Sequence, residues 1–502
     1  MMRAIAIAAL LLAACGKVES GGDVTLTLEP PSVFFRRGET AMVQVTAADA
    51  VNTIAVTAAG LPPGVTADPL ALDGPAPGML ALHADATATE GLASVTLTAD
   101  VGGSTDLRVL VGGPPGTLDE SFADGGKLVP QLSALSLASR GMVFTDAGAV
   151  VTGFVQSSPP QAITLRVRED GTLDPGFGDA GFVSTGAGAG IAEGIAVTNL
   201  PDGHVIVAGI SGGSGAADSD FGLYGYTAAG DLDASFGASG VASLDPGSGF
   251  GELHSVLVAP DGSLLVAGAL FPADGSAPTT RALRYSAGGM QDTAYNVTEP
   301  GIAVEGAAVQ PDGKLVIVGG QSSSFFVARY GANGARDTGF GSGGVVTTAF
   351  GSAFANANGV VVLPGGKLLV AGIVTLSTES HIGVARYNAN GSLDVTFGSG
   401  GKIEPPMLFG SVSPTGVIAS GDKLLFVGEV ANVPAVVRLN ADGSPDAAFG
   451  TGGVVTVDFG VTGSSNRTQA FGVAVDPDGR ILISAELGPS GSESLGIARL
   501  WP

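Results

Sequence analysis

Cysteine and basic residues are scarce in this chain of 502 residues. A single cysteine, Cys15, leaves no possibility of an intramolecular disulfide. Lys and Arg number 22 against 46 Asp and Glu, which gives a formal net charge of −24. A chain without a basic stripe cannot displace the counterions of a nucleic acid, nor adsorb electrostatically to an anionic membrane surface. We therefore expect no nucleic-acid partner.

Helical patterns are missing as well. Charged residues make up 14% of the chain, and no long segment has an apolar rhythm of 3.6 residues. The apolar run Ala4–Ala14 has eleven residues, whereas a bilayer-spanning helix needs about 20. Its position after Arg3 and before Cys15 is typical of an export signal peptide, which we assign to residues 1–14.

The end of that run resembles a bacterial lipobox. Its residues are Leu12-Ala13-Ala14-Cys15, and the resemblance implies that Cys15 is lipidated, with residues 15–23 as a polar tether. Gly16 follows the cysteine, which in the enterobacterial sorting pattern favours the outer membrane. We expect a lipid-anchored protein of the bacterial cell envelope, on the periplasmic or the surface face. The alternative is an ordinary signal peptide with an unrelated cysteine.

Glycine, by contrast, is abundant, with 81 residues, and much of it belongs to a repeat. Seven times a glycine is followed three residues later by an aspartate, and three residues after that by an aromatic residue. The copies are Gly116-Asp119-Phe122, Gly171-Asp174-Phe177, Gly230-Asp233-Phe236, Gly289-Asp292-Tyr295, Gly334-Asp337-Phe340, Gly391-Asp394-Phe397 and Gly443-Asp446-Phe449. Successive aspartates are 45 to 59 residues apart. A period in this range indicates one supersecondary unit used repeatedly.

Each unit also contains a hairpin signal between two apolar runs. In four copies it is Pro-Asp-Gly, at 201–203, 260–262, 311–313 and 477–479. Four strands in each of seven units predict a seven-bladed β-propeller over residues 117–502. We expect the strand at 127–129 to pair with 496–498, so that the two ends of the array close the ring. The copy at Asp292 is short and lacks Phe-Gly-x-x-Gly, so its blade could lack a full outer strand.

The preceding segment, residues 24–112, has a different pattern. Six short runs alternate apolar and polar residues between Gly, Pro and Asp turns, which predicts a β-sandwich. The stretch 60–65, Gly-Leu-Pro-Pro-Gly-Val, resembles a loop of bacterial immunoglobulin-like modules. The fold class is therefore all-β, an immunoglobulin-like sandwich followed by the propeller.

The repeat array resembles the delta-60 repeat of bacterial surface proteins. That signature is approximately Leu-Asp-x-x-Phe-Gly-x-x-Gly, then Pro-Asp-Gly-Lys, then Ala-Arg-Tyr. It is best preserved at 393–401, 311–314, 328–330 and 385–387. The resemblance implies the architecture and a surface location, and it implies no agreed biochemical activity.

An arginine stands eight residues before the repeat aspartate in five copies. These pairs are Arg166/Asp174, Arg284/Asp292, Arg329/Asp337, Arg386/Asp394 and Arg438/Asp446. Arg499 has no aspartate after it, and Asp119 has no arginine before it, so we expect these two to pair across the closure. The copy at Asp233 has Gly225 in place of the arginine. We interpret the pairs as a structural ion ladder, one per blade; the alternative is a ring of binding arginines.

Residues suited to catalysis are few. The four histidines, His83, His204, His254 and His381, have no metal-ligand spacing. One aspartate per turn is far from the six to eight oxygen ligands that Ca²⁺ requires. We expect no cofactor, no metal and no enzymatic activity. The sequence favours a non-catalytic binding or scaffold module with an unknown protein or glycan ligand; the alternatives are a channel-centred hydrolase or lactonase and a purely structural envelope protein.

Overall fold

The computed structural model describes most of the chain after the N-terminal segment. The described residues are 24–50, 52–130, 132, 136–186, 191–215, 218–245, 249–351, 354–376, 379–404, 412–460, 467–488 and 493–502. The expected signal peptide 1–14, Cys15 and the tether 15–23 lie outside them. The chain divides into two compact units, Met1–Gly112 and Gly113–Pro502. Within the described ranges we find no helix of the length and apolarity needed to cross a membrane.

The first unit consists of strands. They are β1 (Leu26–Glu29), β2 (Ser32–Arg36), β3 (Thr40–Ala47), β4 (Thr53–Ala59), β5 (Val65–Ala67), β6 (Leu70–Asp73), β7 (Gly78–Ala84), β8 (Gly91–Ala99) and β9 (Ser104–Gly112). One sheet has the order β1-β3-β7-β5 and the other β2-β9-β8-β4-β6. Both contribute to one hydrophobic core, in which Val43, Leu82, Val95 and Leu107 are fully buried. The six alternating runs correspond to β1, β3, β4, β7, β8 and β9; the sequence analysis missed β2, β5 and β6.

The second unit is built from groups of four strands, which we number in chain order. Group 1 is β11 (Leu137–Thr145), β12 (Gly148–Val155), β13 (Gln161–Val167) and β14 (Phe182–Thr185); group 2 is β15 (Ile191–Asn199), β16 (Val205–Gly215), β17 (Asp218–Tyr226) and β18 (Val241–Leu244); group 3 is β19 (Gly249–Val258), β20 (Leu264–Pro272), β21 (Thr279–Tyr285) and β22 (Gln291–Pro300); group 4 is β23 (Val304–Val309), β24 (Leu315–Gln321), β25 (Ser324–Tyr330) and β26 (Val345–Thr348).

The remaining groups follow the same plan. Group 5 is β27 (Phe354–Val362), β28 (Leu368–Leu376), β29 (Glu379–Tyr387) and β30 (Lys402–Ile403), with the 3₁₀ turn η1 (Pro364–Gly366) between its first two strands; group 6 is β31 (Val412–Ser420), β32 (Lys423–Val430), β33 (Val433–Leu439) and β34 (Val454–Thr456); group 7 is β35 (Arg467–Val475), β36 (Ile481–Gly488) and β37 (Ser494–Leu500) with β10 (Lys127–Leu128). Neighbouring strands within each group are antiparallel, and a single parallel bridge, Ser219 to Phe250, joins groups 2 and 3 into one eight-stranded sheet.

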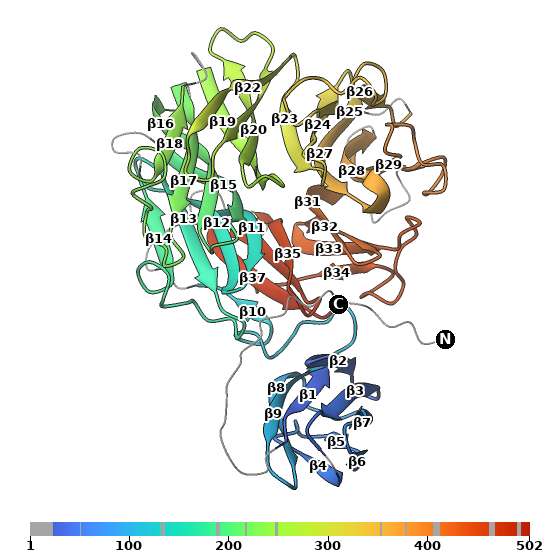
Figure 1. Ribbon diagram of the computed structural model, residues 1–502. Coiled ribbons are helices and arrows are strands. Elements are labelled where there is room, and N and C mark those ends of the chain that lie inside the picture. Colours follow the sequence, from blue (N-terminus) through green and yellow to red (C-terminus); the bar gives the residue numbers. More distant parts are fainter. Residues whose placement is uncertain are drawn as a thin grey trace. The chain divides into compact units, whose positions relative to one another are not determined.

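The groups surround a common centre, and their first strands lie innermost (Figure 1). Each first strand contacts the first strand of the next group, and β35 contacts β11. The hydrophobic clusters follow the same circle, because each combines side chains from two neighbouring groups. One of them joins group 7 to group 1 through Ile497 and Leu165. The core of this unit therefore lies between the sheets and has no free end.

The ends of the array meet in group 7. Strand β10 is the outer edge of the order β10-β37-β36-β35, and Lys127 pairs with Ala498. Next to this pairing, the Trp501 amide donates to the carbonyl of Thr117 at 2.9 Å, and the Gly116 amide donates to the carbonyl of Trp501 at 2.9 Å. The structure thus pairs β10 with β37.

Group 3, whose repeat copy is short, has a complete outer strand. Strand β22 has ten residues and pairs with β21 from Thr279 to Tyr285, with a register shift next to Arg284. The short repeat copy therefore has a full outer strand. The missing Phe-Gly-x-x-Gly removes the turn that precedes the outer strand elsewhere, so the outer strand already begins at Gln291, the residue before the repeat aspartate.

Candidate functional site

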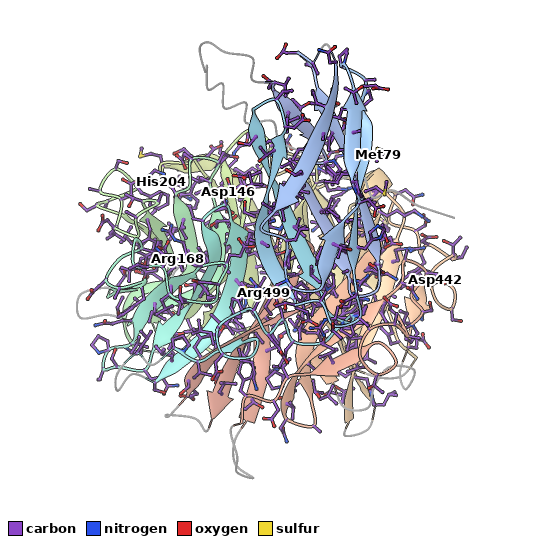
Figure 2. All side chains as sticks on the ribbon, turned by 90° about the horizontal axis from the view of Figure 1, so that it is seen from below. Met79, Asp146, Arg168, His204, Asp442 and Arg499 are labelled. Carbon is purple, nitrogen blue, oxygen red and sulfur yellow. The ribbon has the colours of Figure 1, made fainter. Side chains whose placement is uncertain are left out.

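The structure brings all six proposed arginine–aspartate pairs together. The distances from the arginine Nε to the aspartate Oδ2 are 2.7 Å for Arg166–Asp174, 2.9 Å for Arg284–Asp292, 2.8 Å for Arg329–Asp337, 2.8 Å for Arg386–Asp394, 2.8 Å for Arg438–Asp446 and 2.8 Å for Arg499–Asp119. Arg499, labelled in Figure 2, has 3% of its side chain exposed and Asp119 has none. The pair in group 3 is the most open, at 28% for Arg284 and 33% for Asp292.

The repeat motif positions each pair through its own turn. In the copy at Asp446, the carboxylate Oδ1 accepts the amide of Ala448 at 3.2 Å, and the Asp446 carbonyl accepts the amide of Phe449 at 2.9 Å. The turn places the Phe449 ring under the Arg438 guanidinium, 4.2 Å from the ring centroid. The other pairs show the same stacking at 4.5 to 5.1 Å. Aspartate and aromatic residue therefore hold the arginine from two sides.

The repeat glycine has a steric reason. Gly230 has a φ of +84°, and a Cβ there would lie 2.6 Å from the amide nitrogen of Gly178 in the preceding copy. Gly391 has a φ of +86° and the same relation to Gly341, at 2.8 Å. Only glycine tolerates both the left-handed backbone and the close approach. The motif is thus a joint between neighbouring groups.

The guanidinium groups extend this joint. Arg166 Nη1 donates to the carbonyl of Ala228 at 2.7 Å, and Arg329 Nη1 donates to that of Ala389 at 2.6 Å; both acceptors belong to the following copy. Arg499 Nη1 donates to the carbonyl of Glu169. Since these donors are used within the protein, the ladder has the contacts of a structural device. The geometry favours that interpretation over a ring of binding arginines.

The copy without an arginine, at Asp233, has a different packing. A Cβ at Gly225 would lie 2.4 Å from the ring of Phe236, so the aromatic side chain occupies the space that the arginine uses elsewhere. His204 approaches the orphaned aspartate instead, with its Nε2 3.6 Å from Asp233 Oδ2.

A second cation contacts most ladder aspartates, which the sequence analysis missed. It is the residue directly after the hairpin turn, and the distances to the aspartate Oδ2 are 3.5 Å for Lys314–Asp337, 2.6 Å for Lys367–Asp394, 3.0 Å for Lys423–Asp446 and 3.6 Å for Arg480–Asp119. In group 1 the extra cation is Arg168, 3.0 Å from Asp174. The sequence contained a signal for this second cation, because a basic residue follows the hairpin turn in several copies.

The first strands contain a second repeated feature, a β-bulge at the same place. In each of the seven, within the described residues, the register of pairs with the second strand skips one residue. These residues are Arg140, Ile195, His254, Glu305, Asn358, Thr415 and Phe471. All are half-buried. We call this set the bulge ring.

Neighbouring bulges lie against each other. A Cβ at Gly141 would be 2.9 Å from the carbonyl oxygen of Ile195, and one at Gly306 would be 2.6 Å from that of Asn358. Arg140 also lies over the Phe471 ring, at 4.7 Å. The small residue after each bulge, glycine in five copies, was the signal that the sequence offered. Bulges redirect side chains and occur next to functional sites.

The bulge ring is chemically mixed. Arg140 pairs with Glu486 at 2.7 Å, the Thr415 hydroxyl donates to the carbonyl of Ala470, and Asn358 Oδ1 accepts the amide of Ile373 at 3.3 Å. His254, one of the four histidines without metal-ligand spacing, belongs to this ring. In the described part of the chain no group of three or more His, Cys, Asp and Glu could hold a metal ion.

The other histidines lie apart. His83 Nε2 is 3.1 Å from Asp68 Oδ1 in the first unit. His381 is buried in β29. Neither of these two histidines is a member of the bulge ring.

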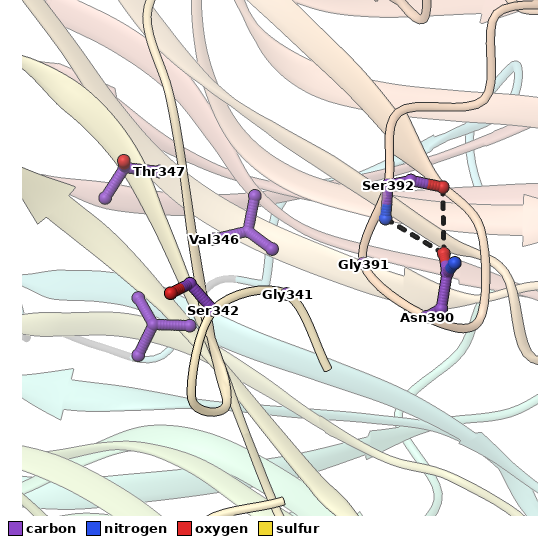
Figure 3. Close-up of a pocket in the computed structure, with 8 residues that line it drawn as sticks. Gly341, Ser342, Val346, Thr347, Asn390, Gly391 and Ser392 are labelled. Carbon is purple, nitrogen blue, oxygen red and sulfur yellow. Dashed lines mark hydrogen bonds between the residues drawn. The ribbon is translucent and has the colours of Figure 1, made fainter. Parts of the chain in front are cut away.

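A cavity of about 550 Å³ lies between β26 and the turn at 390–392 (Figure 3). In that turn the Ser392 hydroxyl donates to Asn390 Oδ1 at 2.8 Å, and the Ser392 amide donates to it at 3.0 Å. No lining residue is ionisable. This cavity therefore offers only neutral hydrogen bonds. Two smaller cavities border Arg284.

Comparison with known proteins gives one family match. A family model described as "Domain of unknown function (DUF5122) beta-propeller" matches residues 200–236, 310–340, 363–397 and 422–449. Each segment ends at a repeat aromatic residue and begins near a hairpin turn. A search of curated proteins finds no match.

Solved structures show similarity at low identity. The β-propeller domain of the Trilobed protease from Pyrococcus furiosus is 9% identical, with 72% of this chain and 95% of that chain covered and a TM-score of 0.36. A protein from Lactobacillus plantarum is 11% identical, with 74% and 96% covered and a TM-score of 0.40. Sqt1 of Chaetomium thermophilum is 12% identical, with 90% and 97% covered and a TM-score of 0.39.

The family match and the circular arrangement of sheets agree. The matched segments include the hairpin turns and the Gly-Asp-aromatic motifs of groups 2, 4, 5 and 6. The first strands of all groups contact one another around the centre. Residues Gly113–Pro502 therefore form a β-propeller.

Proposed function

We propose that this protein is a non-catalytic binding or scaffold module whose seven-bladed propeller recognises a protein or glycan at the bulge ring. One observation carries the proposal: seven equivalent bulges hold seven different side chains, while the joints between groups repeat the same motif. Positions that serve the fold repeat in such an array, whereas a site for one ligand breaks the repeat. The chemistry of the ring suits recognition, since it mixes charged, amide, hydroxyl, aliphatic and aromatic groups.

The test is a binding screen with the full chain against glycan and peptide arrays. The variant His254→Ala/Glu305→Ala/Asn358→Ala removes polar groups from three consecutive bulges. Val395→Ala is the matched control, because Val395 is 73% exposed on the outer joint of group 5. We expect the ring variant to lose a ligand that the control retains. A ligand that both variants bind equally well would refute the ring as the binding surface.

The hydrolase or lactonase alternative rests on two residues. His254 and Glu305 occupy consecutive bulges, and a histidine beside a carboxylate can act as a general base. Turnover of ester, lactone or glycoside substrates that disappears in His254→Ala would establish this alternative in place of the binding module.

We further propose that the module is displayed from the cell envelope. Cys15 carries the lipid anchor, the protein is sorted to the outer membrane, and residues 24–112 form an immunoglobulin-like stalk. The lipobox residues support the anchor. Mass spectrometry of the mature N-terminal peptide should find two or three acyl chains on Cys15, because a single chain binds a membrane only weakly. An unmodified N-terminus downstream of Cys15 would exclude the anchor.

A further inference from the structure

One ladder aspartate has fewer cations around it than the others. Asp119, Asp174, Asp337, Asp394 and Asp446 each contact their ladder arginine and one further basic side chain. In group 3, Arg284 is the single cation that contacts Asp292 among the described residues. The position after the hairpin turn, which is lysine in groups 4, 5 and 6, is Ser263 there.

Space is present where the lysine is missing. A cavity of about 240 Å³ is lined by Asp261, Ser263 and Arg284, together with the turn of group 4 around Asp312. A second cavity of about 380 Å³ shares Ser263 and Arg284 and extends to Asp292. Serine and arginine thus stand between the two spaces. We call the two cavities together the group 3 recess.

The charges of the recess favour a cation. Asp261, Asp292 and Asp312 are among the residues that line the two cavities, and Arg284 is the one cation among those residues. Lys314 is not part of the lining, but it pairs with Asp312 at 3.0 Å. Arg284 is already engaged, because it donates to Asp292 and to the carbonyl of Ala332 at 3.1 Å. The Ser263 hydroxyl and amide hold the pKa of Asp261 below its usual range. The Arg284 hydrogen bond does the same for the pKa of Asp292. Both carboxylates are therefore charged at neutral pH.

The neighbouring groups show which cation fits. In group 4 the Lys314 ammonium lies 3.0 Å from Asp312 and 3.5 Å from Asp337, so it bridges the turn aspartate and the ladder aspartate. The equivalent carboxylates in group 3 are Asp261 and Asp292. Pro260, Leu265, Pro311 and Ala332 also line the smaller cavity, and their apolar atoms suit the methylene groups of a lysine stem.

We propose that the group 3 recess binds the primary ammonium group of an alkyl amine, as found at the end of a lysine side chain, in the place that Lys314 fills in group 4. The ligand supplies the second cation that Asp292 lacks. This site lies at the joint between groups 3 and 4 and does not depend on the bulge ring.

Two variants convert one group into the other. Ser263→Lys supplies the ammonium from within the chain, and Lys314→Ser opens the same space in group 4. The ligand is Nα-acetyl-lysine N-methylamide, titrated into the full chain by saturation-transfer NMR, with the norleucine analogue as the neutral control. We expect saturable binding of the lysine ligand alone, no binding in Ser263→Lys, and a second equivalent in Lys314→Ser.

Further measurements separate the possible failures. Asp292→Asn should weaken binding roughly fivefold, the factor that one partly exposed ion pair supplies. Equal affinity for n-butylammonium would identify free amines as sufficient, whereas tighter binding of the lysine derivative would identify a lysine of a partner. The bulge-ring triple variant should bind the amine as the wild type does, so that a failed ring leaves this proposal testable. Absence of saturable binding to the wild type, or unchanged binding in Ser263→Lys, would overturn the proposal.

Discussion

The pair Arg499–Asp119 offers the sharpest test of how the propeller closes. The two residues are 380 positions apart, their Nε and Oδ2 atoms lie 2.8 Å apart, and 3% and 0% of their side chains are exposed. Removal of one partner from a buried pair leaves an uncompensated charge, which costs about 3–5 kcal/mol. We therefore expect Arg499→Ala to lower the free energy of unfolding by about that amount.

Asp119→Ala should cost at least as much. Arg480 Nη1 also lies 3.6 Å from Asp119 Oδ2, so loss of the carboxylate leaves two buried guanidinium groups facing each other. Arg480 keeps a second partner, Asp476, at 2.6 Å. Burial and the charge of Arg480 already lower the pKa of Arg499 below its usual value. The double variant should cost much less than the sum, because it removes both charges that the single variants strand.

Group 3 supplies the matched control. Arg284 and Asp292 have the same geometry but are 28% and 33% exposed, so each Ala variant should cost below about 1 kcal/mol. Urea unfolding followed by tryptophan fluorescence is the assay. Trp501, the single tryptophan, is buried at the closure, and its backbone pairs with Thr117. Equal costs at the two pairs, or additive costs at the closure, would refute this account of the closure.

Three further predictions concern the joints. Gly171→Ala should destabilise the protein more than Gly262→Ala. Both residues have a positive φ, which costs alanine about 1–2 kcal/mol. A Cβ at Gly171 would also lie 2.4 Å from a backbone nitrogen, whereas a Cβ at Gly262 would meet nothing within 4 Å. Equal urea midpoints would contradict this. Gly225→Arg should lower the thermal midpoint although it restores the repeat's arginine, because the space is taken; a higher midpoint would show that the aromatic ring moves aside. The hydrogen bond from Lys367 is the main cause of the lowered pKa of Asp394 in the folded protein. A carboxylate whose pKa is lowered by folding stabilises the protein above its unfolded pKa of about 3.9, and this stability is lost as the pH falls through the folded pKa. Lys367→Met should therefore unfold at a higher pH in acid titration, and an unchanged acid midpoint would contradict the role of the lysine.

Periodic features were predictable from the sequence. The repeat of Gly, Asp and an aromatic residue predicted the unit, and the constant offset of eight residues predicted the arginine partner. Arg499 and Asp119 were the two residues left without a partner at this offset, which predicted that they pair with each other. These inferences depended on positions where the fold allows few residue types. Because the same residue types recur there in successive copies, the pattern is visible in the sequence.

The bulge ring was not predictable in the same way. The register of the sheet skips the bulged residue, so the fold places little demand on its identity, and its seven occupants differ in chemistry. The space behind Ser263 was hidden for a related reason. A serine at this position is informative only when one knows that the lysine in the other groups contacts an aspartate more than 20 residues further along the chain. Lys314, for example, contacts Asp337.

The pairing of β10 with β37 also determines when this protein can be finished during its biosynthesis. Strand β10 is among the first of the propeller to be synthesised, yet its only partner in the described sheet is β37, the last strand in chain order. Until a ribosome has made that strand, β10 lacks its partner in the sheet and group 7 is incomplete. A chain released before β37 is made therefore has an unpaired strand edge at β10, which can pair with another chain.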